Sequence, residues 1–399
     1  MTVGRVAVVG AGAVGATTAR DLADHGLDVT LFERDRIDWD GDRARRTPSE
    51  AASARAAGVV YDAYAEDIDA ALAARAVERF RAFDGARGFQ FHDCPYAILV
   101  HEGDDERIEA TRRAAARMRE HGRAVETLAP AAFGDRFPSV AVDDLAVAAV
   151  AADAGWTDTR RYVAAALGAA RAADVTVRDA TPVTLETATR LSLPDGTVSF
   201  DAVVVAAGAH TPQLAAGVGV DLAAVPYRVQ ALTVGTDDSP HGGPMWYDAT
   251  EGVYARPHPD GLLVGDGTVP EATAPDGWDR TADDWFRADA LAVARERTTG
   301  LDVPTDAWAG VCTATPDGDP LLGRADEGLY VATGWQGHGF MRAPAHAELL
   351  AARVAADLGA DADPTTVPGG ATALAAFDPA RFPAGTEFEV REGMLVEER

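Results

Sequence analysis

The chain has 399 residues, 47% hydrophobic and 25% charged, a composition typical of a soluble globular protein with enough core for two domains. Its formal net charge is −27, and all 36 of its Lys plus Arg residues are Arg. The lack of lysine excludes pyridoxal phosphate enzymes, other Schiff-base enzymes and Walker-type phosphate loops, since each requires a lysine side chain.

The first predicted element is a short apolar strand that ends in a glycine-rich turn. Residues 5–9 lead into Gly10, Gly12 and Gly15, and an alanine-rich helix runs on to about Gly26. In a dinucleotide-binding turn, the first glycine permits the tight turn and the second lets the backbone approach a pyrophosphate. The third lets the helix pack closely on its strand. The free N–H groups that begin the helix then face the phosphates.

A second strand, from Asp28 to Phe32, places Glu33 at its end. A carboxylate at this position accepts hydrogen bonds from the hydroxyls of an adenosine ribose. Strand, glycines, helix, strand and acid occur in the required order, so the sequence predicts a dinucleotide-binding unit at the N-terminus. The pattern does not say which dinucleotide is bound.

Helices and strands continue to alternate along the chain. The pattern predicts helices around 66–85, 104–121 and 159–172, and strands at 95–100, 175–177, 182–185 and 201–205. The last strand runs into Gly208, where small residues allow a second close approach of backbone to a dinucleotide. Between about 221 and 304, extended pieces such as 252–257 and 261–265 predict an antiparallel sheet. 

The chain then returns to the first domain through 308–320 and 328–344. In the second of these segments, Gly337 to Phe340 lead into a helix, and the sequence predicts Pro344 in its first turn, a favoured place for proline.

These segments together resemble the D-amino-acid-oxidase-type (DAO) FAD-dependent oxidoreductases, especially the group of sarcosine oxidase β-subunit, glycine oxidase and dimethylglycine dehydrogenase. The resemblance spans nearly the whole chain and rests on the N-terminal glycines with Glu33, on Gly208, and on residues 52–58, 315–317, 337–340 and 377–382. It implies an α/β fold in which a Rossmann-like FAD-binding domain of the glutathione-reductase type carries an inserted antiparallel-sheet substrate domain. The predicted FAD-binding domain is discontinuous (1–85, 148–220 and 305–360), the substrate domain comprises 86–147 and 221–304, and 361–399 form a C-terminal extension.

The resemblance implies FAD as cofactor, and the predicted helix after Gly337 supports it. The positive end of that helix would stabilise the negative charge that reduction places at flavin N1 and O2. Adenine is expected beside Val183, the pyrophosphate over the N-terminal glycines, and the flavin between 53–59 and 334–341. The residues expected to bind FAD are Gly10, Ala11, Gly12, Ala13, Val14, Gly15, Glu33, Arg34, Ser53, Ala56, Ala57, Gly58, Val59, Val183, Ala207, Gly208, Gly310, Gly334, Gly337, His338, Gly339, Phe340 and Met341.

Cys312 lies near the segment that carries a covalent flavin link in monomeric relatives. Its spacing to Thr315-Pro316-Asp317 is shorter than in those relatives, so noncovalent FAD is expected.

The predicted substrate end departs from the family pattern. Glycine oxidases are similar but carry an Arg at the position of Cys312, whereas monomeric sarcosine oxidases carry an Arg in the stretch matching Tyr61 and a Lys matching Met341. All three positions are uncharged here. A substrate carboxylate still needs a partner, because burying it unpaired costs several kcal/mol.

Arg256 is the predicted replacement, because period-two alternation places it on one strand face with Tyr254, which matches a tyrosine of related active sites. A salt bridge at the rim for Arg256 and core packing for Tyr254 are the alternatives. Arg342 and Arg228 are further candidates for the anchor, and Tyr61 could donate one hydrogen bond. His338 is expected either at the flavin or bonded to backbone.

The predicted reaction is removal of a hydride from a small amino acid or N-methylated amino acid, resembling sarcosine, glycine or dimethylglycine, to leave an imine. The predicted catalytic residues are Tyr254, Arg256, His338 and Tyr61, with solvent or His338 taking the amine proton. Leu263 matches the lysine that assists oxygen reaction in monomeric sarcosine oxidase, so a dehydrogenase or slow oxidase with an open choice of electron acceptor is expected. 

Three alternatives stay open for the function. They are oxidation of a 2-hydroxy acid on the same scaffold, a flavin-bearing noncatalytic subunit of a larger complex, and a flavin domain acting on modified transfer RNA, which the acidity of the chain disfavours.

The acid-rich, lysine-free composition is typical of a salt-loving host, since molar salt screens self-repulsion. A GC-rich genome is the alternative explanation. No nucleic-acid partner is expected because the chain lacks a basic patch. Neither metal-ligand spacing nor a disulfide framework is evident, and no stretch is apolar enough to span a membrane. With a strand starting close to Met1, the sequence predicts a cytoplasmic protein. A homo-oligomer and a subunit of a hetero-oligomer are both compatible with the sequence, which leaves the oligomeric state open.

Overall fold

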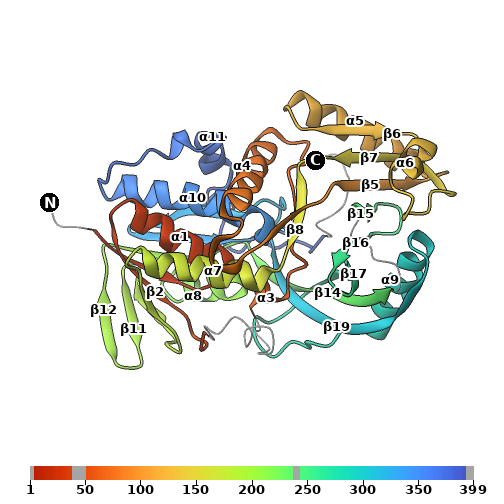
Figure 1. Cartoon of the computed structure of the whole chain (residues 1–399). Helices are drawn as coiled ribbons and strands as arrows, with labels where there is room; N and C mark the ends of the chain where they lie inside the picture. The colour runs from red at the N-terminus through yellow and green to blue at the C-terminus, as the bar shows by residue number, and fades with distance from the viewer. Residues whose placement is uncertain (1–3, 38–50, 237–242, 392–399) are drawn as a thin grey trace.

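The computed structural model describes residues 4–37, 51–236 and 243–391, and its largest elements are two β-sheets (Figure 1). The first sheet has six strands in the order β20-β21-β13-β1-β2-β9, and its pairs are parallel except for β20 with β21. Its strands are β1 (Arg5–Val9), β2 (Asp28–Phe32), β9 (Thr176–Arg178), β13 (Ala202–Val205), β20 (Leu321–Asp326) and β21 (Leu329–Thr333). The central strands β1 and β13 are continuously apolar because a parallel sheet is buried on both faces.

Four long helices pack around this sheet: α1 (Ala13–Asp24), α4 (Asp67–Phe83), α7 (Thr159–Ala172) and α10 (Gly339–Asp357). Helix α1 lies beside α10 and α7, and α10 also packs on α4 (Figure 1). A buried ion pair joins three of them: the Arg79 guanidinium donates to both Asp21 carboxylate oxygens at 2.8 Å and to the Pro344 carbonyl at 2.6 Å. The start of α10 is thereby held in a fixed position relative to α1.

The second sheet has nine strands in the order β18-β14-β17-β16-β15-β5-β7-β6, with β19 paired to β14 off this path. Its strands are β5 (Tyr96–His101), β6 (Val125–Leu128), β7 (Leu145–Ala151), β14 (Val225–Thr236), β15 (Met245–Asp248), β16 (Val253–His258), β17 (Gly261–Gly265), β18 (Val269–Ala272) and β19 (Leu301–Ala314). The parallel pair of β5 with β15 unites two segments that are distant in the sequence. Helices α5 (Asp105–Glu120), α6 (Pro130–Arg136) and α9 (Asp284–Arg297) complete this part of the molecule.

Two small three-stranded sheets and several short helices connect these parts. One small sheet comprises β10 (Thr184–Thr187), β11 (Arg190–Leu193) and β12 (Gly196–Ser199), and the other β3 (Val59–Tyr61), β4 (Phe91–Asp93) and β8 (Ala154–Thr157). The short helices are α3 (Ala52–Arg55), α8 (Thr211–Ala216) and α11 (Gly370–Ala376), with 3-10 turns at Ala86–Gly88, Gly208–His210 and Pro364–Thr366. The last residues of the predicted C-terminal extension, 392–399, lie outside the described residues.

The fold class predicted from the sequence is confirmed, and most predicted elements form close to their predicted bounds. The prediction for Pro344 was wrong: α10 begins at Gly339, so Pro344 lies inside the helix, in its second turn, rather than in the first. A proline there removes one N–H from the helical hydrogen-bond ladder, and the surrounding tertiary contacts of α10 stabilise the helix in spite of this loss.

Strand β19 extends the nine-stranded sheet past the domain boundary that the sequence predicts at residue 305. It pairs with β14 from Leu301 to Ala314, so the chain leaves this sheet only after Ala314. The apolar stretch around 308–314 is equally suited to either sheet, and the long pairing with β14 decides between them.

Candidate functional site

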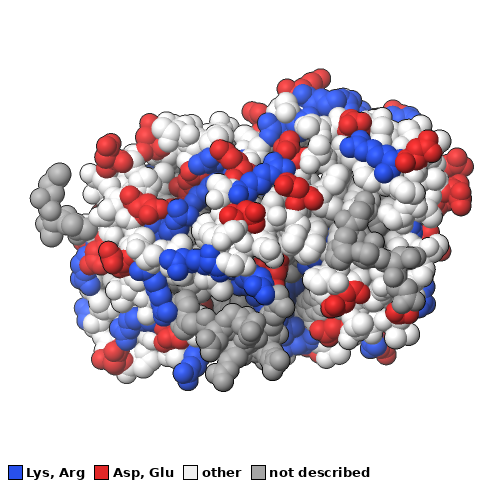
Figure 2. Space-filling view, in the orientation of Figure 1, with Lys and Arg blue, Asp and Glu red and all other residues white. Residues whose placement is uncertain are grey.

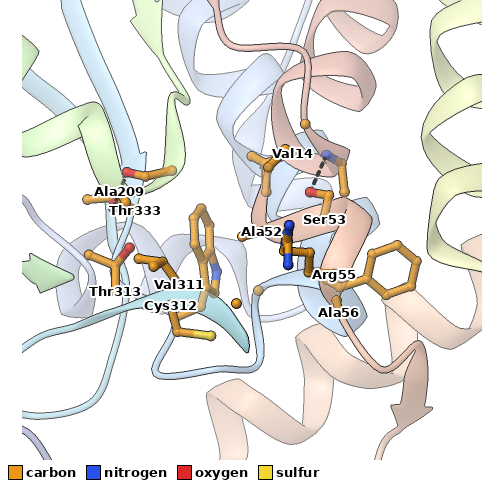
Figure 3. A pocket seen from close by; sticks show the side chains of 18 of the residues that line it. Val14, Ala52, Ser53, Arg55, Ala56, Ala209, Val311, Cys312, Thr313 and Thr333 are labelled. Carbon is orange, nitrogen blue, oxygen red and sulfur yellow. Dashed lines mark hydrogen bonds between the residues drawn. The ribbon is translucent and has the colours of Figure 1, made fainter. Parts of the chain in front are cut away.

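A cavity of about 640 Å³ is lined by residues of both large sheets. Its walls come from the turn after β1, from α3, from β14 and β19, and from the segment that begins α10. Its size lies within the range of about 300–1,000 Å³ that is usual for ligand and cofactor sites. Figure 3 shows Ser53, Arg55 and Ala56 on one side of this cavity and Val311, Cys312 and Thr313 of β19 on another.

The glycines after β1 are required by the backbone around them. Gly10 has a φ of +103°, and a Cβ atom there would lie 2.5 Å from the Ala206 carbonyl oxygen. A Cβ at Gly15 would lie 1.9 Å from the Gly10 carbonyl oxygen, so α1 packs directly on the turn. The Ala13 N–H donates to Ser53 Oγ at 3.0 Å, which joins the start of α1 to α3. The turn therefore has the close packing of a pyrophosphate site at the start of a helix.

Glu33 lies at the end of β2, next to this turn, and its carboxylate is fixed by two backbone donors. Oε2 accepts the Ala11 N–H at 2.8 Å and Oε1 accepts the Asp35 N–H at 3.0 Å. The neighbouring Arg34 pairs with Asp276 at 3.1 Å. Glu33, Arg34 and Val183 all line the cavity, as an adenosine site beside this turn requires.

The structure brings most of the predicted FAD residues into this one cavity. Those that line it are Gly10, Gly12, Ala13, Val14, Glu33, Arg34, Ser53, Ala56, Ala57, Gly58, Val59, Val183, Ala207, Gly208, Gly310, Gly337, His338, Gly339, Phe340 and Met341. Ala11, Gly15 and Gly334 are not among the lining residues. Ala11 and Gly15 belong to the turn behind the wall, and a Cβ at Gly334, whose φ is +84°, would lie 2.4 Å from the Thr315 side chain.

The start of α10 forms another part of the cavity wall. His338 is the N-cap residue, and Gly339, Phe340 and Met341 form the first turn. The N–H groups of a first helical turn have no partner within the helix and carry partial positive charge. They present a fixed positive end to the cavity, which suits the electron-rich pyrimidine side of a reduced flavin.

Aromatic side chains line the cavity beside this helix. The Tyr61 ring stacks on the Tyr96 ring, with centroids 4.3 Å apart, and the Tyr61 hydroxyl lies 3.3 Å from His338 Nε2. Burial raises the pKa of Tyr61 well above its ordinary value, so its phenol stays protonated. A protonated phenol is a hydrogen-bond donor for an anionic substrate group.

Tyr254 and Cys312 line the cavity from neighbouring parts of the nine-stranded sheet. Tyr254 lies opposite Gly265 in the register of β16 with β17, and a Cβ at Gly265 would lie 2.3 Å from the Tyr254 hydroxyl. Burial, reinforced by the Asp266 charge, raises the pKa of Tyr254 above its ordinary value. The same two causes raise the pKa of the Cys312 thiol to about 12, so both groups are neutral at physiological pH.

Arg256 is not among the residues that line the cavity. Its Nε donates to the Ala57 carbonyl at 2.5 Å, its Nη1 donates to the Pro257 carbonyl at 2.6 Å, and its guanidinium lies 4.9 Å from the Trp156 ring centroid. Desolvation lowers the pKa of Arg256 to about 10. The Arg256 guanidinium thus binds the backbone of Ala57, a lining residue, from outside the cavity.

The other two arginines considered as anchors also have partners elsewhere. Arg342 is buried and pairs with Asp69 at 2.7 Å, and Arg228 pairs with Asp283 at 3.3 Å. Neither lines the cavity.

Three charged residues of the cavity wall were not predicted from the sequence: Asp35, Arg55 and Asp266. Arg55 ends α3, donates to the Ala309 carbonyl at 2.8 Å and lies 5.5 Å from the Trp278 ring centroid. Asp266 follows β17 directly. The segment 52–58 pointed to the neighbourhood of Arg55, but the pairing of β17 with β16 and β14, which brings Asp266 to the cavity, has no short sequence signature.

Two other kinds of site, a metal centre and a membrane-spanning helix, are absent from the described ranges. No group of three or more His, Cys, Asp or Glu residues there is arranged to hold a metal ion. No helix in these ranges is both long and apolar enough to cross a membrane.

Comparison with known proteins gives matches over most of the chain. The family described as FAD dependent oxidoreductase (DAO) matches residues 5–353. Glycine oxidase from Pseudomonas aeruginosa is 27% identical over 365 residues, which cover 87% of this chain and 93% of that protein. Glycine oxidase from Bacillus subtilis is 28% identical over 164 residues, 40% of this chain and 42% of that protein.

Solved structures share the fold. The crystal structure of L-proline dehydrogenase from P. horikoshii matches with a TM-score of 0.81 and 23% identity, over 95% of this chain and 97% of that one. Glycine oxidase from Geobacillus kaustophilus matches with a TM-score of 0.77 and 22% identity, over 96% of this chain and 100% of that one. With the family match over most of its length and the dinucleotide turn at its N-terminus, the chain belongs to the DAO family of FAD-dependent oxidoreductases.

Proposed function

We propose that this enzyme oxidises the C–N bond of a small amino acid or N-methylated amino acid, with noncovalently bound FAD as hydride acceptor. The observation that carries the proposal is one continuous cavity. It joins the glycine turn and the N-terminus of α10 to a substrate end lined by Tyr61 and Tyr254. The relatives named glycine oxidase and the structural neighbour named L-proline dehydrogenase support an amino acid as the substrate class.

The residues present fit FAD. Glu33 would hold the ribose, the turn around Gly10 and Gly12 would hold the pyrophosphate, and the first turn of α10 would face the flavin. When bound, FAD would accept a hydride, which carries the two electrons of the oxidation. The raised pKa of the Cys312 thiol supports noncovalent binding, because a protonated thiol is a poor nucleophile.

The chain's own residues orient the substrate and exclude water. The neutral phenols of Tyr61 and Tyr254 donate hydrogen bonds to the substrate carboxylate, and strands β14, β16 and β19 of the nine-stranded sheet form part of the cavity wall. Holding the reacting C–H bond in one orientation accounts for much of the expected rate gain, since the hydride acceptor is the cofactor itself. Leu263 is buried in β17 and offers no charge for oxygen activation, which supports a dehydrogenase or a slow oxidase.

An anaerobic titration tests the proposal. The purified protein, kept in molar KCl, is mixed with sarcosine, dimethylglycine, glycine, proline and D-amino acids, and separately with glycolate and lactate, while the flavin absorbance is recorded. We expect a flavin spectrum that is released by acid precipitation, and loss of the oxidised band with at least one amine. Bleaching by a hydroxy acid alone would replace this function with 2-hydroxy acid oxidation. The absence of flavin, or of bleaching by any compound, would overturn the proposal.

A pair of tyrosine variants tests the substrate end. Tyr254→Phe removes a donor from the cavity wall, whereas Tyr247→Phe alters a fully buried tyrosine that pairs with Tyr254 in the β15–β16 register but does not line the cavity. We expect Tyr254→Phe to slow flavin reduction or weaken substrate binding by about tenfold or more, the value of a hydrogen bond to a charged group. Tyr247→Phe should retain the wild-type rate, and equal losses in both variants would argue for a packing effect.

A further inference from the structure

Asp266 carries a carboxylate in the substrate half of the cavity wall, and the reaction proposed above gives it no role. It directly follows Gly265, the last residue of β17, and is half-buried. Its φ of +82° lies in the left-handed region, which costs a residue other than glycine of order 1–3 kcal/mol and is typical of functional positions.

Its surroundings hold Asp266 in place. The Thr268 hydroxyl donates to Asp266 Oδ1 at 2.8 Å. At Gly267, between the two, a Cβ would lie 2.4 Å from the Phe286 ring, and the Gln230 side-chain amide donates to the Gly267 carbonyl at 3.3 Å. The turn therefore packs against α9 and β14, and these contacts hold the Asp266 carboxylate in place.

Three cavity groups from three other strands lie within electrostatic reach of Asp266. Its charge contributes to the raised pKa of Tyr254 on β16, of Cys312 on β19 and of Tyr96 on β5. These groups are neutral at physiological pH, and all three line the same cavity. A negative charge on Asp266 favours a cationic ligand atom at its own oxygens, whereas the neutral phenol of Tyr254 can donate to the anionic group of the same substrate.

We propose that Asp266 binds the substrate amino group, selects amines over 2-hydroxy acids and accepts the amine proton before hydride transfer. The inference rests on the proposed function and assigns the proton acceptor that the sequence left open between solvent and His338. An ammonium N–H bond breaks, and its proton moves to an Asp266 carboxylate oxygen. The electron pair of that bond stays on nitrogen as a lone pair. When the hydride leaves the adjacent carbon for the proposed FAD, this pair forms the C=N bond of an iminium ion, which gives the imine by releasing one further proton to solvent.

The test compares substrates with their oxygen isosteres. Methoxyacetate has the shape and carboxylate of sarcosine but no amino group, and tetrahydrofuran-2-carboxylate relates to proline in the same way. Binding of each is measured by the flavin difference spectrum, and the rate of flavin reduction by sarcosine and proline is measured as a function of pH. The variants are Asp266→Asn, Thr268→Val and, as matched control, Asp260→Asn, an exposed carboxylate in the turn before β17.

We expect the wild type and Asp260→Asn to prefer the amine to its isostere. Asp266→Asn should bind the amine at least tenfold more weakly while binding the isostere as well as before or better. Its reduction rate should also rise only at higher pH, because the amine must then enter already deprotonated. Thr268→Val keeps the carboxylate but removes its hydroxyl donor. We expect this variant to show a smaller loss of amine preference than Asp266→Asn and a smaller shift of the pH profile of flavin reduction.

Several results would overturn the inference. They are an unchanged preference and pH profile in Asp266→Asn, and equal weakening of amine and isostere in a variant that retains its flavin. If Asp266→Asn fails to fold, a wild-type preference and pH profile in Thr268→Val would likewise reject it. If no amine alters the wild-type flavin spectrum, the proposed function fails together with this inference. A wild type that is reduced by amines, with an Asp266→Asn variant that behaves identically, rejects the role of Asp266 alone.

Discussion

At the level of single residues, Cys312 has a chemistry that its position in the cavity controls. The ordinary pKa of a cysteine thiol is near 9, and burial together with the Asp266 charge raises the pKa of Cys312 to about 12. Between pH 9 and 12 the unfolded chain releases this proton while the folded chain keeps it. The folded state then binds more protons, so this thiol's contribution to stability falls as the pH rises through that window.

The raised pKa predicts that Cys312 is inert toward alkylation in the native protein. At pH 8 we expect iodoacetamide to modify it at least about a hundredfold more slowly than in urea, because the thiolate is the reacting form. Mass spectrometry of digests taken over time measures both rates. Cys94, whose pKa burial raises to about 11, serves as the internal comparison and should also react slowly. Rapid modification of Cys312 in the folded protein would contradict the assignment of a protonated thiol.

Arg256 illustrates why a residue's role is harder to predict than its place. The alternation predicts that Tyr254 and Arg256 share one strand face at the substrate site; both lie on β16, but only Tyr254 lines the cavity. The guanidinium, however, is directed to the carbonyls of Ala57 and Pro257, and this choice depends on a segment almost two hundred residues away in the sequence. A strand pattern contains no information about such a partner.

At the level of elements, the β1–α1 unit was predictable because every part of its geometry is local. The turn glycines, the helix and the acid at the end of β2 follow one another in the sequence. The close contact of Gly15 with the Gly10 carbonyl joins residues only five positions apart. The nine-stranded sheet is different. Its β5–β15 pair and the long β14–β19 pair join distant segments, so their register depends on the packing of the whole sheet.

The contact at Gly15 predicts the effect of one methyl group. Gly15→Ala would place a Cβ atom 1.9 Å from a backbone oxygen, so α1 must move away from the turn. We expect the purified variant to lose most of its flavin and about 1–3 kcal/mol of stability, as overpacked sites do. Flavin absorbance and urea unfolding measure both effects.

Gly26→Ala is the matched control at the other end of α1. Its φ is +80° and nothing lies within 4 Å of an added Cβ, so only the backbone strain of about 1–2 kcal/mol should appear. Full flavin content in both variants would show that the close packing at Gly15 does not shape the cofactor site.

At the level of the whole molecule, the charge balance sets the expected response to salt. The chain has 63 acidic residues and 36 arginines, and Figure 2 shows side chains of both charges distributed over the visible surface. Many arginines are in ion pairs with exposed carboxylates, such as Arg81 with Asp93 and Asp153, but the excess of acids leaves strong net repulsion at neutral pH. Salt screens this repulsion, since the Debye length falls from about 10 Å at 0.1 M to about 3 Å at 1 M.

We therefore predict that the midpoint of thermal unfolding rises by several degrees between 0.1 M and 2 M KCl at pH 7. Differential scanning calorimetry of the flavin-loaded protein measures this shift. Near pH 4.6, the isoelectric point of the sequence, the net charge vanishes and the gain from KCl should shrink. A midpoint that does not depend on KCl at pH 7 would favour a GC-rich genome as the origin of the composition, in place of adaptation to salt.

The sequence by itself determined the dinucleotide turn, most of the helices, the alternation of strands and the family, because these depend on neighbours a few residues apart. The tertiary structure decided which distant side chains share one cavity. It placed Arg55 and Asp266 in the wall, turned Arg256 toward the Ala57 carbonyl, and put Pro344 inside α10, where packing outweighs the lost hydrogen bond. The physical reason is range: a turn or a helix is fixed by local backbone geometry, whereas the charge and shape of a cavity arise from contacts between segments that the sequence separates.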